Sequence, residues 1–337
     1  MTKPLKIVIP MAGYGSRLRP LTWSRPKPLI PLAGKTVLDY VLDMFSSVPE
    51  TAQAEYVFIL GPTMGEQIQA HTARFYPDWQ VDYAVQPEMK GQSDAFWQAR
   101  EFLHGPMLMA FSDTLIDSNF SFLDQEEADI ITWVKPVPDP RRFGVAEINK
   151  DGWVTRLIEK PEDTRNNLAL VGCYYFREAE TLISAIEEQV KRDVALKGEY
   201  YLVEAVNILL EEGLKMRTQE VNVWLDAGTP EALLTTNRYL LENGSDNSDQ
   251  LTDFANVTIV PPVNIHPDAV VRNTVIGPHV SIGEKTVVED SIVKDSIIGS
   301  NNQITNCHLA GSLIGHGAVI TGQSGQAYLG DDCRLVP

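Results

Sequence analysis

A glycine-bearing loop follows the first apolar run of the chain. The run from Leu5 to Met11 predicts a buried strand, and Gly13 and Gly15 come directly after it. A loop that leaves a strand with glycines at these places can turn its backbone N–H groups toward a phosphate chain. The opening of the sequence therefore indicates a phosphate-binding loop.

Two well-known phosphate-binding motifs do not describe this loop. The dinucleotide-binding motif G-x-G-x-x-G is excluded because Leu18 stands where its third glycine would be. The triplet Gly34-Lys35-Thr36 ends like a Walker A motif, but Leu29 occupies the place of the required first glycine. The loop therefore belongs to another class of phosphate-binding segment.

The run from Gly13 to Lys35 resembles the signature of the sugar-1-phosphate nucleotidylyltransferases, G-x-G-x-R-L-x-P-x-T followed by P-K-P-L-x-P and G-K. Arg17 and Lys27 occupy its two cationic positions. Tyr14 departs from it, since the family usually carries a small residue there. A tyrosine would reshape the mouth of the pocket without removing a charge. A glycine turn with a solvated basic loop, the alternative, would not account for the whole run. The resemblance implies a nucleotide-binding set of Met11, Ala12, Gly13, Gly15, Ser16, Arg17 and Lys27.

The segment from Gln86 to Gly91, followed by Asp94-Ala95, resembles the nucleobase-reading loop of the same family. The Gln86 amide offers a donor and an acceptor, which suits the N3–H and a carbonyl of uracil or thymine. Gly91 has no side chain, so its backbone can approach the base. The alternative is a surface glutamine beside a turn.

Two aspartates stand at places where a metal could be held. Asp113 follows the apolar run Met107–Phe111, and Asp226 precedes a predicted helix. Two carboxylates from distant segments could converge at a sheet edge and hold one Mg²⁺, which prefers one or two carboxylates plus phosphate oxygens. The resemblance implies the same pair of metal ligands. Taken alone, Asp226 has the alternative of a helix N-cap.

Three further segments, at 143–145, 158–161 and 171–174, resemble the elements that bind the acceptor sugar phosphate. Glu159 can accept hydrogen bonds from sugar hydroxyls, and Lys160 can pair with the sugar phosphate. An exposed ion pair at a strand end is the alternative for these two residues. The resemblance implies a sugar-phosphate-binding set of Gly144, Glu159, Lys160, Gly172 and Tyr174.

The reaction that the resemblance implies is attack of a sugar 1-phosphate oxygen on the α-phosphorus of a nucleoside triphosphate. A phosphate monoester has its second pKa near 6, so it is largely dianionic at pH 7 and needs no general base. Catalysis would consist of positioning and charge neutralisation. The predicted catalytic residues, on the triphosphate, the metal and the acceptor, are Arg17, Lys27, Asp113 and Lys160.

The expected substrates are dTTP or UTP with a hexose 1-phosphate, glucose 1-phosphate first. Thymine differs from uracil by one methyl, worth only ~1–3 kcal/mol in an apolar pocket, so both bases are expected to be accepted. Three alternatives remain open. They are a mannose-1-phosphate guanylyltransferase, a non-catalytic subunit that binds a nucleotide sugar to regulate a partner, and an enzyme with a second, acyltransferase activity.

The elements that must position these residues alternate along the first part of the chain. Short apolar runs and helix-like patterns follow one another from Lys6 to about Leu241, which predicts βαβ units. The expected fold class is α/β, a Rossmann-like mixed, mostly parallel sheet with helices on both faces. Such sheets bind ligands beyond the carboxyl ends of their strands, where the motifs above fall.

The period changes after a polar stretch. Aliphatic residues then recur at spacings of five or six, often followed by glycine, which predicts a short left-handed parallel β-helix with glycine at its tight corners. The expected domains are 1–243, catalytic; 244–254, a linker; and 255–337, the β-helix, expected to build a homo-oligomer. The periodic residues are Ile265, Val271, Ile276, Ile282, Val288, Val293, Ile298, Ile304, Leu309, Ile314 and Ile320.

Composition excludes several classes of protein. The 337 residues include 28 Lys and Arg against 45 Asp and Glu, a net charge of −17, which argues against nucleic acid as a partner. No stretch approaches the ~20 apolar residues of a membrane helix. The three cysteines, Cys173, Cys307 and Cys333, form no zinc or disulfide pattern. We expect a cytoplasmic protein.

Overall fold

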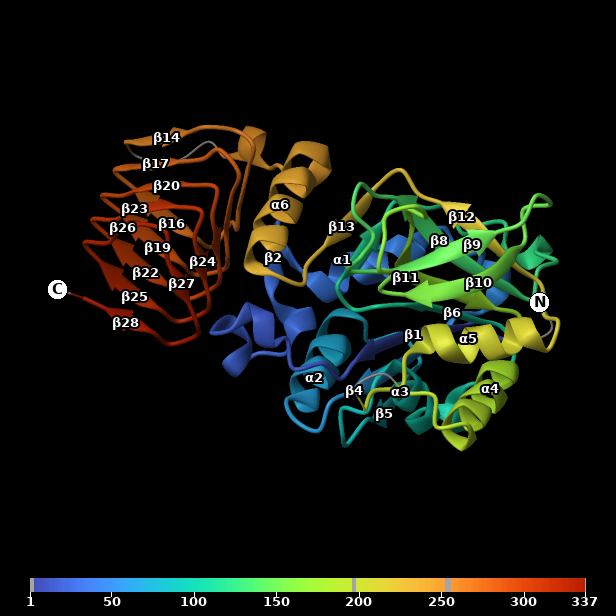
Figure 1. Cartoon of the computed structure of the whole chain (residues 1–337). Coiled ribbons are helices and arrows are strands. Elements are labelled where there is room, and N and C mark those ends of the chain that lie inside the picture. Colours follow the sequence, from blue (N-terminus) through green and yellow to red (C-terminus); the bar gives the residue numbers. More distant parts are fainter. Residues whose placement is uncertain (1–2, 196–197, 252–255, 337) are drawn as a thin grey trace. The chain divides into compact units, whose positions relative to one another are not determined.

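The computed structural model describes residues 3–195, 198–251 and 256–336. The chain divides into two compact units (Figure 1). Unit 1 comprises Met1–Gly13 and Val41–Trp224, and unit 2 comprises Tyr14–Tyr40 and Leu225–Pro337. Residues 14–35 of the run that carries the family signature, called the signature loop below, therefore belong to the same unit as the β-helix.

The centre of unit 1 is a parallel section of sheet in the order β6–β1–β4–β5. Its strands are the short apolar runs of the sequence, and β1 and β6 are almost wholly buried. Because the four strands are parallel, their carboxyl ends lie at one edge of the sheet. Their bounds are β1 (Lys6–Met11), β4 (Glu55–Leu60), β5 (Val81–Val85) and β6 (Met107–Ala110).

Antiparallel strands extend this sheet on the side of β6. Strand β11 pairs antiparallel with β6, β8 and β9, and β12 pairs parallel with β8. The register of β11 against β8 shifts between Leu170 and Tyr174, so the strand is irregular around Gly172. The remaining strands of this sheet are β8 (Ile130–Pro136), β9 (Gly144–Ile148), β10 (Val154–Glu159), β11 (Leu168–Phe176) and β12 (Met216–Glu220), and β7 (Thr114–Ile116) lies outside it.

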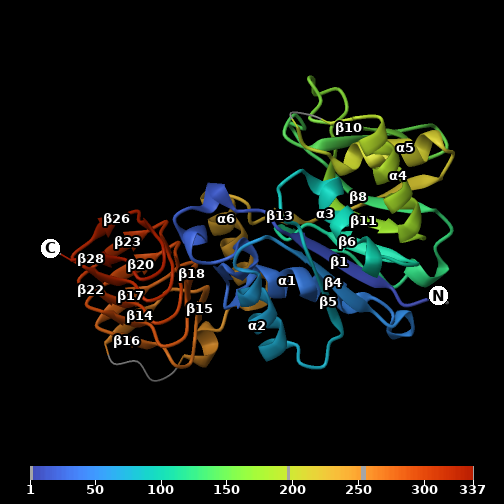
Figure 2. The same cartoon turned by 90° about the horizontal axis from the view of Figure 1, so that it is seen from below.

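Helices cover the sheet of unit 1. Apolar side chains of α3, α4 and α5 form one core with β1 and β4, including Phe96, Ile186 and Val206, all buried. Helix α2 lies on the other side of the sheet (Figure 2), as a right-handed β4–α2–β5 crossover requires. The expected mixed sheet with helices is confirmed. The helices are α2 (Gly65–Phe75), α3 (Gln92–Gln98), α4 (Ala179–Lys191) and α5 (Leu202–Glu211), and α1 (Val37–Asp43) connects the two units in sequence.

Over residues 256–336, the β-helix of unit 2 has three parallel sheets of five strands each, and within each sheet the strands of successive coils lie side by side (Figure 1). The first holds β14 (Val257–Ile259), β17 (Thr274–Ile276), β20 (Ile292–Lys294), β23 (His308–Ala310) and β26 (Ser324–Gly325). The second holds β15 (Val263–Ile265), β18 (Val280–Ile282), β21 (Ile297–Ile298), β24 (Leu313–Ile314) and β27 (Tyr328–Leu329). The third holds β16 (Val270–Arg272), β19 (Val287–Glu289), β22 (Gln303–Thr305), β25 (Val319–Thr321) and β28 (Arg334–Leu335).

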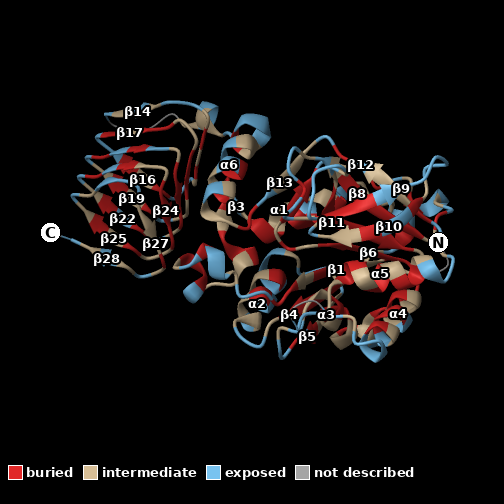
Figure 3. Ribbon diagram, in the orientation of Figure 1, coloured by how far each residue is buried: buried red, intermediate tan, exposed pale blue. Residues whose placement is uncertain are grey.

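The predicted spacing of the β-helix is confirmed residue by residue. All eleven periodic aliphatic residues are buried in one core. Figure 3 shows red, the colour of buried residues, recurring along the coils of the β-helix. The pairing register equals the sum of three successive spacings, because Ile265 pairs with Ile282 and Ile282 with Ile298. Each periodic side chain therefore stacks on its counterpart one coil away.

Close stacking of the coils, rather than positive φ, explains three of the repeated glycines of the β-helix. Gly283, Gly299 and Gly315 do not have positive φ. A Cβ at Gly299 would lie 2.5 Å from the carbonyl oxygen of Gly315 on the next coil. At these three corners glycine is required because adjacent coils touch backbone to backbone. At the fourth, Gly277 has φ of 107°, so there glycine serves the tight turn as expected.

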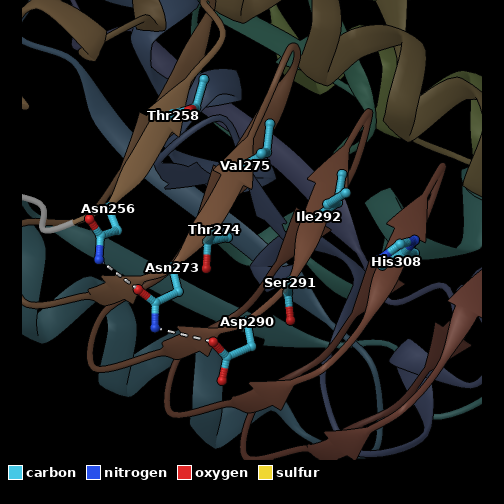
Figure 4. A pocket seen from close by; sticks show the side chains of 9 residues that line it. All are labelled: Asn256, Thr258, Asn273, Thr274, Val275, Asp290, Ser291, Ile292 and His308. Atoms are coloured by element: carbon cyan, nitrogen blue, oxygen red, sulfur yellow. Dashed lines mark hydrogen bonds between the residues drawn. The ribbon is translucent and has the colours of Figure 1, made fainter.

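Another corner of the β-helix carries side chains that tolerate positive φ. Asn256, Asn273 and Asp290 have φ of 56°, 50° and 49°, which Asn and Asp adopt more readily than other residues. Their side chains form a ladder in which each amide donates to the next residue at 3.2 Å (Figure 4). The coils are thus joined at this corner by side-chain hydrogen bonds.

The rest of unit 2 consists of the signature loop and α6 with the segment after it. The loop contains a small antiparallel pair, β2 (Pro31–Leu32) and β3 (Lys35–Thr36). Strand β13 (Trp224–Asp226) leads into α6 (Pro230–Leu240), and short helical turns follow at 241–245 and 248–250. Of the expected linker, 252–254 lie outside the described residues, as does the expected start of the β-helix at 255.

Among the helices of the described residues, none combines the length and the apolar character that crossing a bilayer demands.

We expect Gly299→Ala to destabilise the β-helix by about 1–3 kcal/mol, because the new methyl overpacks a closed backbone contact. The measurement is urea unfolding followed by circular dichroism. Gln303→Ala, an exposed position on the neighbouring strand β22, is the control and should change stability by less than about 0.5 kcal/mol. Equal stability of both variants would contradict the stacking explanation.

Candidate functional site

The carboxyl ends of the parallel strands in unit 1 carry several predicted site residues. Ala12 follows β1, Gln86 follows β5, and Asp113 lies just beyond β6. The ends of β1, β4 and β5 are in contact. A Cβ at Gly61, after β4, would lie 2.7 Å from the Ala12 carbonyl oxygen. The Gln86 N–H donates to the Leu60 carbonyl at 2.8 Å. One edge of the sheet thus holds predicted nucleotide and metal residues.

The Gln86 side chain is built into its loop. It is 3% exposed, so it is not the surface glutamine of the alternative interpretation. Its amide nitrogen donates to the Gly91 carbonyl at 3.0 Å and to the Asp94 carboxylate at 2.8 Å. Gln98 donates to the other oxygen of Asp94 at 3.1 Å. Gln86 therefore organises the loop in which it was predicted to read a base.

Gly91 is required by a neighbouring backbone segment. Its φ is 103°, and a Cβ there would lie 2.5 Å from both N and O of Tyr200. The two segments are hydrogen-bonded, since the Tyr200 N–H donates to Lys90 and the Ser93 N–H donates to the Tyr200 carbonyl. The absence of a side chain at Gly91 therefore serves this close contact.

The irregular part of β11 supports the end of β6. Gly172 has φ of 83°, and a Cβ there would collide with the Phe111 ring. The Phe111 N–H donates to the Gly172 carbonyl at 3.0 Å, and the Thr114 hydroxyl donates to Val171 at 3.0 Å. These contacts flank Asp113 on both sides in sequence. Gly172, predicted for the sugar, thus lies beside the segment that carries the predicted metal ligand.

Glu159, Lys160 and Tyr201 form a connected group at the end of β10. The Lys160 Nζ lies 3.3 Å from the Glu159 carboxylate and donates to the Tyr201 hydroxyl at 3.2 Å. It also lies over the Tyr201 ring, 4.7 Å from the centroid. Gly144 pairs with Glu159 across β9 and β10, and a Cβ at Gly144 would lie 3.3 Å from the Glu159 carboxylate.

Burial separates the two charges of this group. The Glu159 side chain is 15% exposed and that of Lys160 is 47% exposed. Burial raises the pKa of Glu159, although the nearby Lys160 acts in the opposite direction. Burial alone would lower the pKa of Lys160, but Tyr201 and Glu159 more than offset it and the pKa is raised. Lys160 therefore presents a stable positive charge at a partly exposed surface.

Tyr174 lies in the hydrophobic core of unit 1. Its side chain is 3% exposed and stacks near the Phe176 ring, 6.2 Å between centroids. Burial is the main cause of a raised pKa of its hydroxyl, with a smaller contribution from the charge of Glu159. Direct contact with a sugar would require this ring to leave the core.

The signature loop of unit 2 folds back on itself. Gly15 has φ of 59°, and its carbonyl accepts a hydrogen bond from the Thr22 hydroxyl at 2.8 Å. A Cβ at Gly15 would lie 3.1 Å from the Lys27 Cβ, so the loop places Lys27 beside the glycine turn. Ser16 and Arg17 are exposed. The cationic side chains therefore share one loop with the predicted phosphate-binding backbone.

Asp226 is not the N-cap of α6. That position belongs to Thr229, whose side chain accepts from the Ala232 N–H at 3.2 Å. Asp226 is exposed, and one of its carboxylate oxygens accepts from the Gly228 N–H at 2.8 Å. The alternative interpretation of this residue as a helix cap is therefore wrong.

The predicted residues are divided between the two units. Unit 1 holds Asp113 and the sugar-phosphate set, and unit 2 holds Arg17, Lys27 and Asp226. Within residues 3–195, 198–251 and 256–336, no group of three or more His, Cys, Asp or Glu side chains could hold a metal ion. The pairing of Asp113 with Asp226 around a metal therefore stays a prediction.

A depression of about 470 Å³ lies on the β-helix, over β14, β17, β20 and β23 (Figure 4). It contains the Asn256–Asn273–Asp290 ladder and none of the predicted site residues. It is therefore separate from the predicted nucleotide and sugar sets.

Tyr200 and Tyr201 were missed by the sequence analysis. Tyr201 holds Lys160, and the Tyr200 backbone holds the loop at Gly91. No motif connects these tyrosines to residues about 40 and 110 positions earlier. The one sequence signal for these two residues is a pair of tyrosines directly before the apolar helical pattern that begins at Leu202.

The chain matches the nucleotidyl transferase family over residues 6–243. A low-salt glycan biosynthesis nucleotidyltransferase, Agl11, of Haloferax volcanii is 31% identical, covering 98% of both chains. A glucose-1-phosphate thymidylyltransferase of Streptomyces griseus is 28% identical, covering 98% of this chain and 99% of the other. The bifunctional protein GlmU of Methanococcus vannielii is 28% identical, covering 97% of this chain and 78% of its own length.

A solved structure of a putative glucose-1-phosphate thymidylyltransferase from Bacillus anthracis has the same fold. Its TM-score is 0.60 at 23% identity, covering 70% of this chain and 94% of the other. The chain belongs to the nucleotidyl transferase family. The predicted resemblance to this class of enzyme is confirmed, and the protein is a nucleotidyltransferase.

We expect Tyr201→Phe to lower the pKa of Lys160, because phenylalanine keeps the ring but removes the hydroxyl that accepts from the ammonium group. The measurement is an NMR titration of ¹³C-dimethylated lysines, with the Lys160 signal assigned by Lys160→Arg. The control is Tyr200→Phe, since the Tyr200 hydroxyl contacts Asp193 instead. An unchanged titration in Tyr201→Phe would show that the hydroxyl does not hold this charge.

Proposed function

We propose that the protein transfers a nucleotidyl group from dTTP or UTP to a hexose 1-phosphate, with glucose 1-phosphate as the first candidate, and releases pyrophosphate. The observation that carries this proposal is the match with a relative named glucose-1-phosphate thymidylyltransferase over 98% of the chain. A mannose-1-phosphate guanylyltransferase is the alternative within the same class.

The residues supply charge and position rather than a general base. The acceptor phosphate is already largely dianionic at pH 7, so the obstacle is its repulsion from the triphosphate. In the proposal, Arg17 and Lys27 bind the triphosphate, and Lys160 binds the acceptor phosphate. The exposure of Lys160 supports this role, since 47% of its side chain is exposed and its pKa is not lowered by its surroundings, so a charged ammonium group is accessible there.

In the proposal, Asp113 and Asp226 hold a Mg²⁺ ion whose other ligands come from the substrates. Asp113 and Asp226 offer carboxylate oxygens, the ligands that Mg²⁺ prefers, and Asp226 is exposed and not used as a helix cap. In the proposal, phosphate oxygens of the substrates fill the remaining positions around the ion. When bound, the ion would neutralise charge on the phosphates.

Specificity in the proposal comes from the loops that the fold holds rigid. The segment 86–91 meets the base, and its shape is set by the hydrogen bonds of Gln86 and by Tyr200. The Glu159 carboxylate accepts hydrogen bonds from sugar hydroxyls, and Gly144 leaves the space beside this carboxylate without a side chain.

The first test measures pyrophosphate release with dTTP, UTP, GTP, ATP and CTP against glucose, mannose, galactose and N-acetylglucosamine 1-phosphates, with and without Mg²⁺. We expect Mg²⁺-dependent release with dTTP or UTP and glucose 1-phosphate. Release only with GTP and mannose 1-phosphate would replace this proposal by its alternative. Silence from folded protein would favour a nucleotide-sugar-binding subunit.

Variants test the roles of individual residues. Asp113→Ala should nearly abolish turnover, and Lys160→Ala should raise the KM of the sugar phosphate and lower kcat, because each removes charge compensation that positions a phosphate. Lys294→Ala, at an exposed position on β20, is the control and should leave both constants unchanged. Wild-type kinetics in either site variant would remove that residue from the mechanism.

A further inference from the structure

The signature loop is fastened to the last coil of the β-helix. The Asp331 carboxylate accepts from the Ser24 hydroxyl at 3.0 Å and from the Arg25 guanidinium at 3.3 Å. The other oxygen of Asp331 accepts the His316 N–H at 2.8 Å. One side chain therefore ties the loop to two successive coils.

The loop also takes the place of a further coil. Along the glycine corner, a Cβ at Gly315 would lie 2.8 Å from the Gly330 backbone, as a Cβ at Gly299 would meet Gly315. At Gly330 the nearest atom is the Pro20 carbonyl oxygen, 2.9 Å from where a Cβ would stand. The column of backbone contacts thus ends on the signature loop, which covers the open end of this corner.

A second anchor holds the far end of the loop. Asn237 on α6 is 1% exposed. The Oδ1 atom of its side-chain amide accepts hydrogen bonds from the Ala33 N–H at 2.9 Å and from the Ser281 hydroxyl of β18 at 2.7 Å. The loop, α6 and the β-helix therefore meet at one buried amide. The same helix carries Thr236, whose hydroxyl donates to the Asp226 carbonyl at 2.8 Å.

The charges at the Asp331 contact complement each other. The side chains of Arg25 and Asp331 are 25% and 12% exposed, so the pair is partly withdrawn from water. Burial and the nearby Arg25 lower the pKa of His316 to about 4. At neutral pH this imidazole is therefore uncharged and does not repel Arg25. Removing the carboxylate would leave the guanidinium partly buried without this counter-charge.

We propose that Asp331 is a positioning residue for nucleotidyl transfer: the last coil of the β-helix holds the segment from Pro20 to Arg25, and so keeps Lys27 and the Gly15 turn in the conformation that receives the triphosphate. The role in transfer rests on the proposed function. Few residues separate the Asp331 contact from the phosphate-binding part of the loop, since Lys27 lies two residues after Arg25. The Lys27 Cβ is also only 3.1 Å from where a Cβ at Gly15 would stand.

The test compares Asp331→Asn with Asp332→Asn in the full chain. Both changes remove one negative charge, but Asp332 is exposed and has φ of 56°, which asparagine tolerates. We expect Asp331→Asn to raise the KM of the nucleotide by about tenfold, the factor expected from losing a charge-assisted hydrogen bond. The KM of the sugar phosphate should stay unchanged in both variants.

A second readout does not depend on activity. Hydrogen–deuterium exchange of peptides within 14–40 should become faster in Asp331→Asn, while peptides from β4 keep their wild-type rates. Gly330→Ala reaches the loop through a different contact and should accelerate the same peptides. The double variant Ser24→Ala, Asp331→Asn should change the exchange rates by less than the sum of the two single changes, because both side chains take part in one hydrogen bond.

The outcomes separate this inference from the proposed function. If the wild type shows no nucleotidyl transfer but Asp331→Asn still speeds hydrogen exchange in the loop, the result would support the structural contact of Asp331 and refute the proposed function. If the enzyme is active and Asp331→Asn has the same KM for the nucleotide as Asp332→Asn, the positioning role of Asp331 would be overturned. Faster exchange in every peptide would also overturn it, since Asp331 would then act on stability as a whole.

Discussion

The parallel pairing of β6, β1, β4 and β5 is the constraint on which the rest of unit 1 depends. Its register brings the ends of these strands to one edge, with Ala12, Gln86 and Asp113 beyond them. A slip of one residue would turn every buried side chain to the opposite face. The apolar side chains of β1 and β6 therefore have a second effect. By fixing the register of these strands, they also place the polar residues of the following loops next to each other.

The loops at that edge keep their shape through polar contacts, which are buried at Gln86 and partly exposed at Lys160. Gln86 is held by Gly91 and Asp94, and Lys160 is held by Glu159 and Tyr201. Such groups are costly to bury unless they are paired, so each pairing favours a single loop conformation. A site that works by charge and position gains most from this kind of rigidity.

The β-helix is built from two kinds of contact that repeat from coil to coil. Aliphatic side chains stack inside, and glycines let the coils touch at one corner. Because a solenoid has an end that must be covered, the segment at Pro20 can complete the stack that Gly330 leaves open. A nucleotide-binding signature and a structural repeat thereby share one compact unit.

The sequence by itself determined the α/β alternation, the coil length of the β-helix and the family, because these depend on local periodicity and on a long, position-specific signature. It did not determine the roles of Gly91 and Gly283 or the partners of Lys160, which depend on residues brought close only by folding. Tertiary structure alone decided that Tyr201 holds Lys160 and that Asp331 meets Ser24, about 300 positions away in sequence. Long-range contacts of this kind follow from how whole elements pack, and no spacing in the chain encodes them.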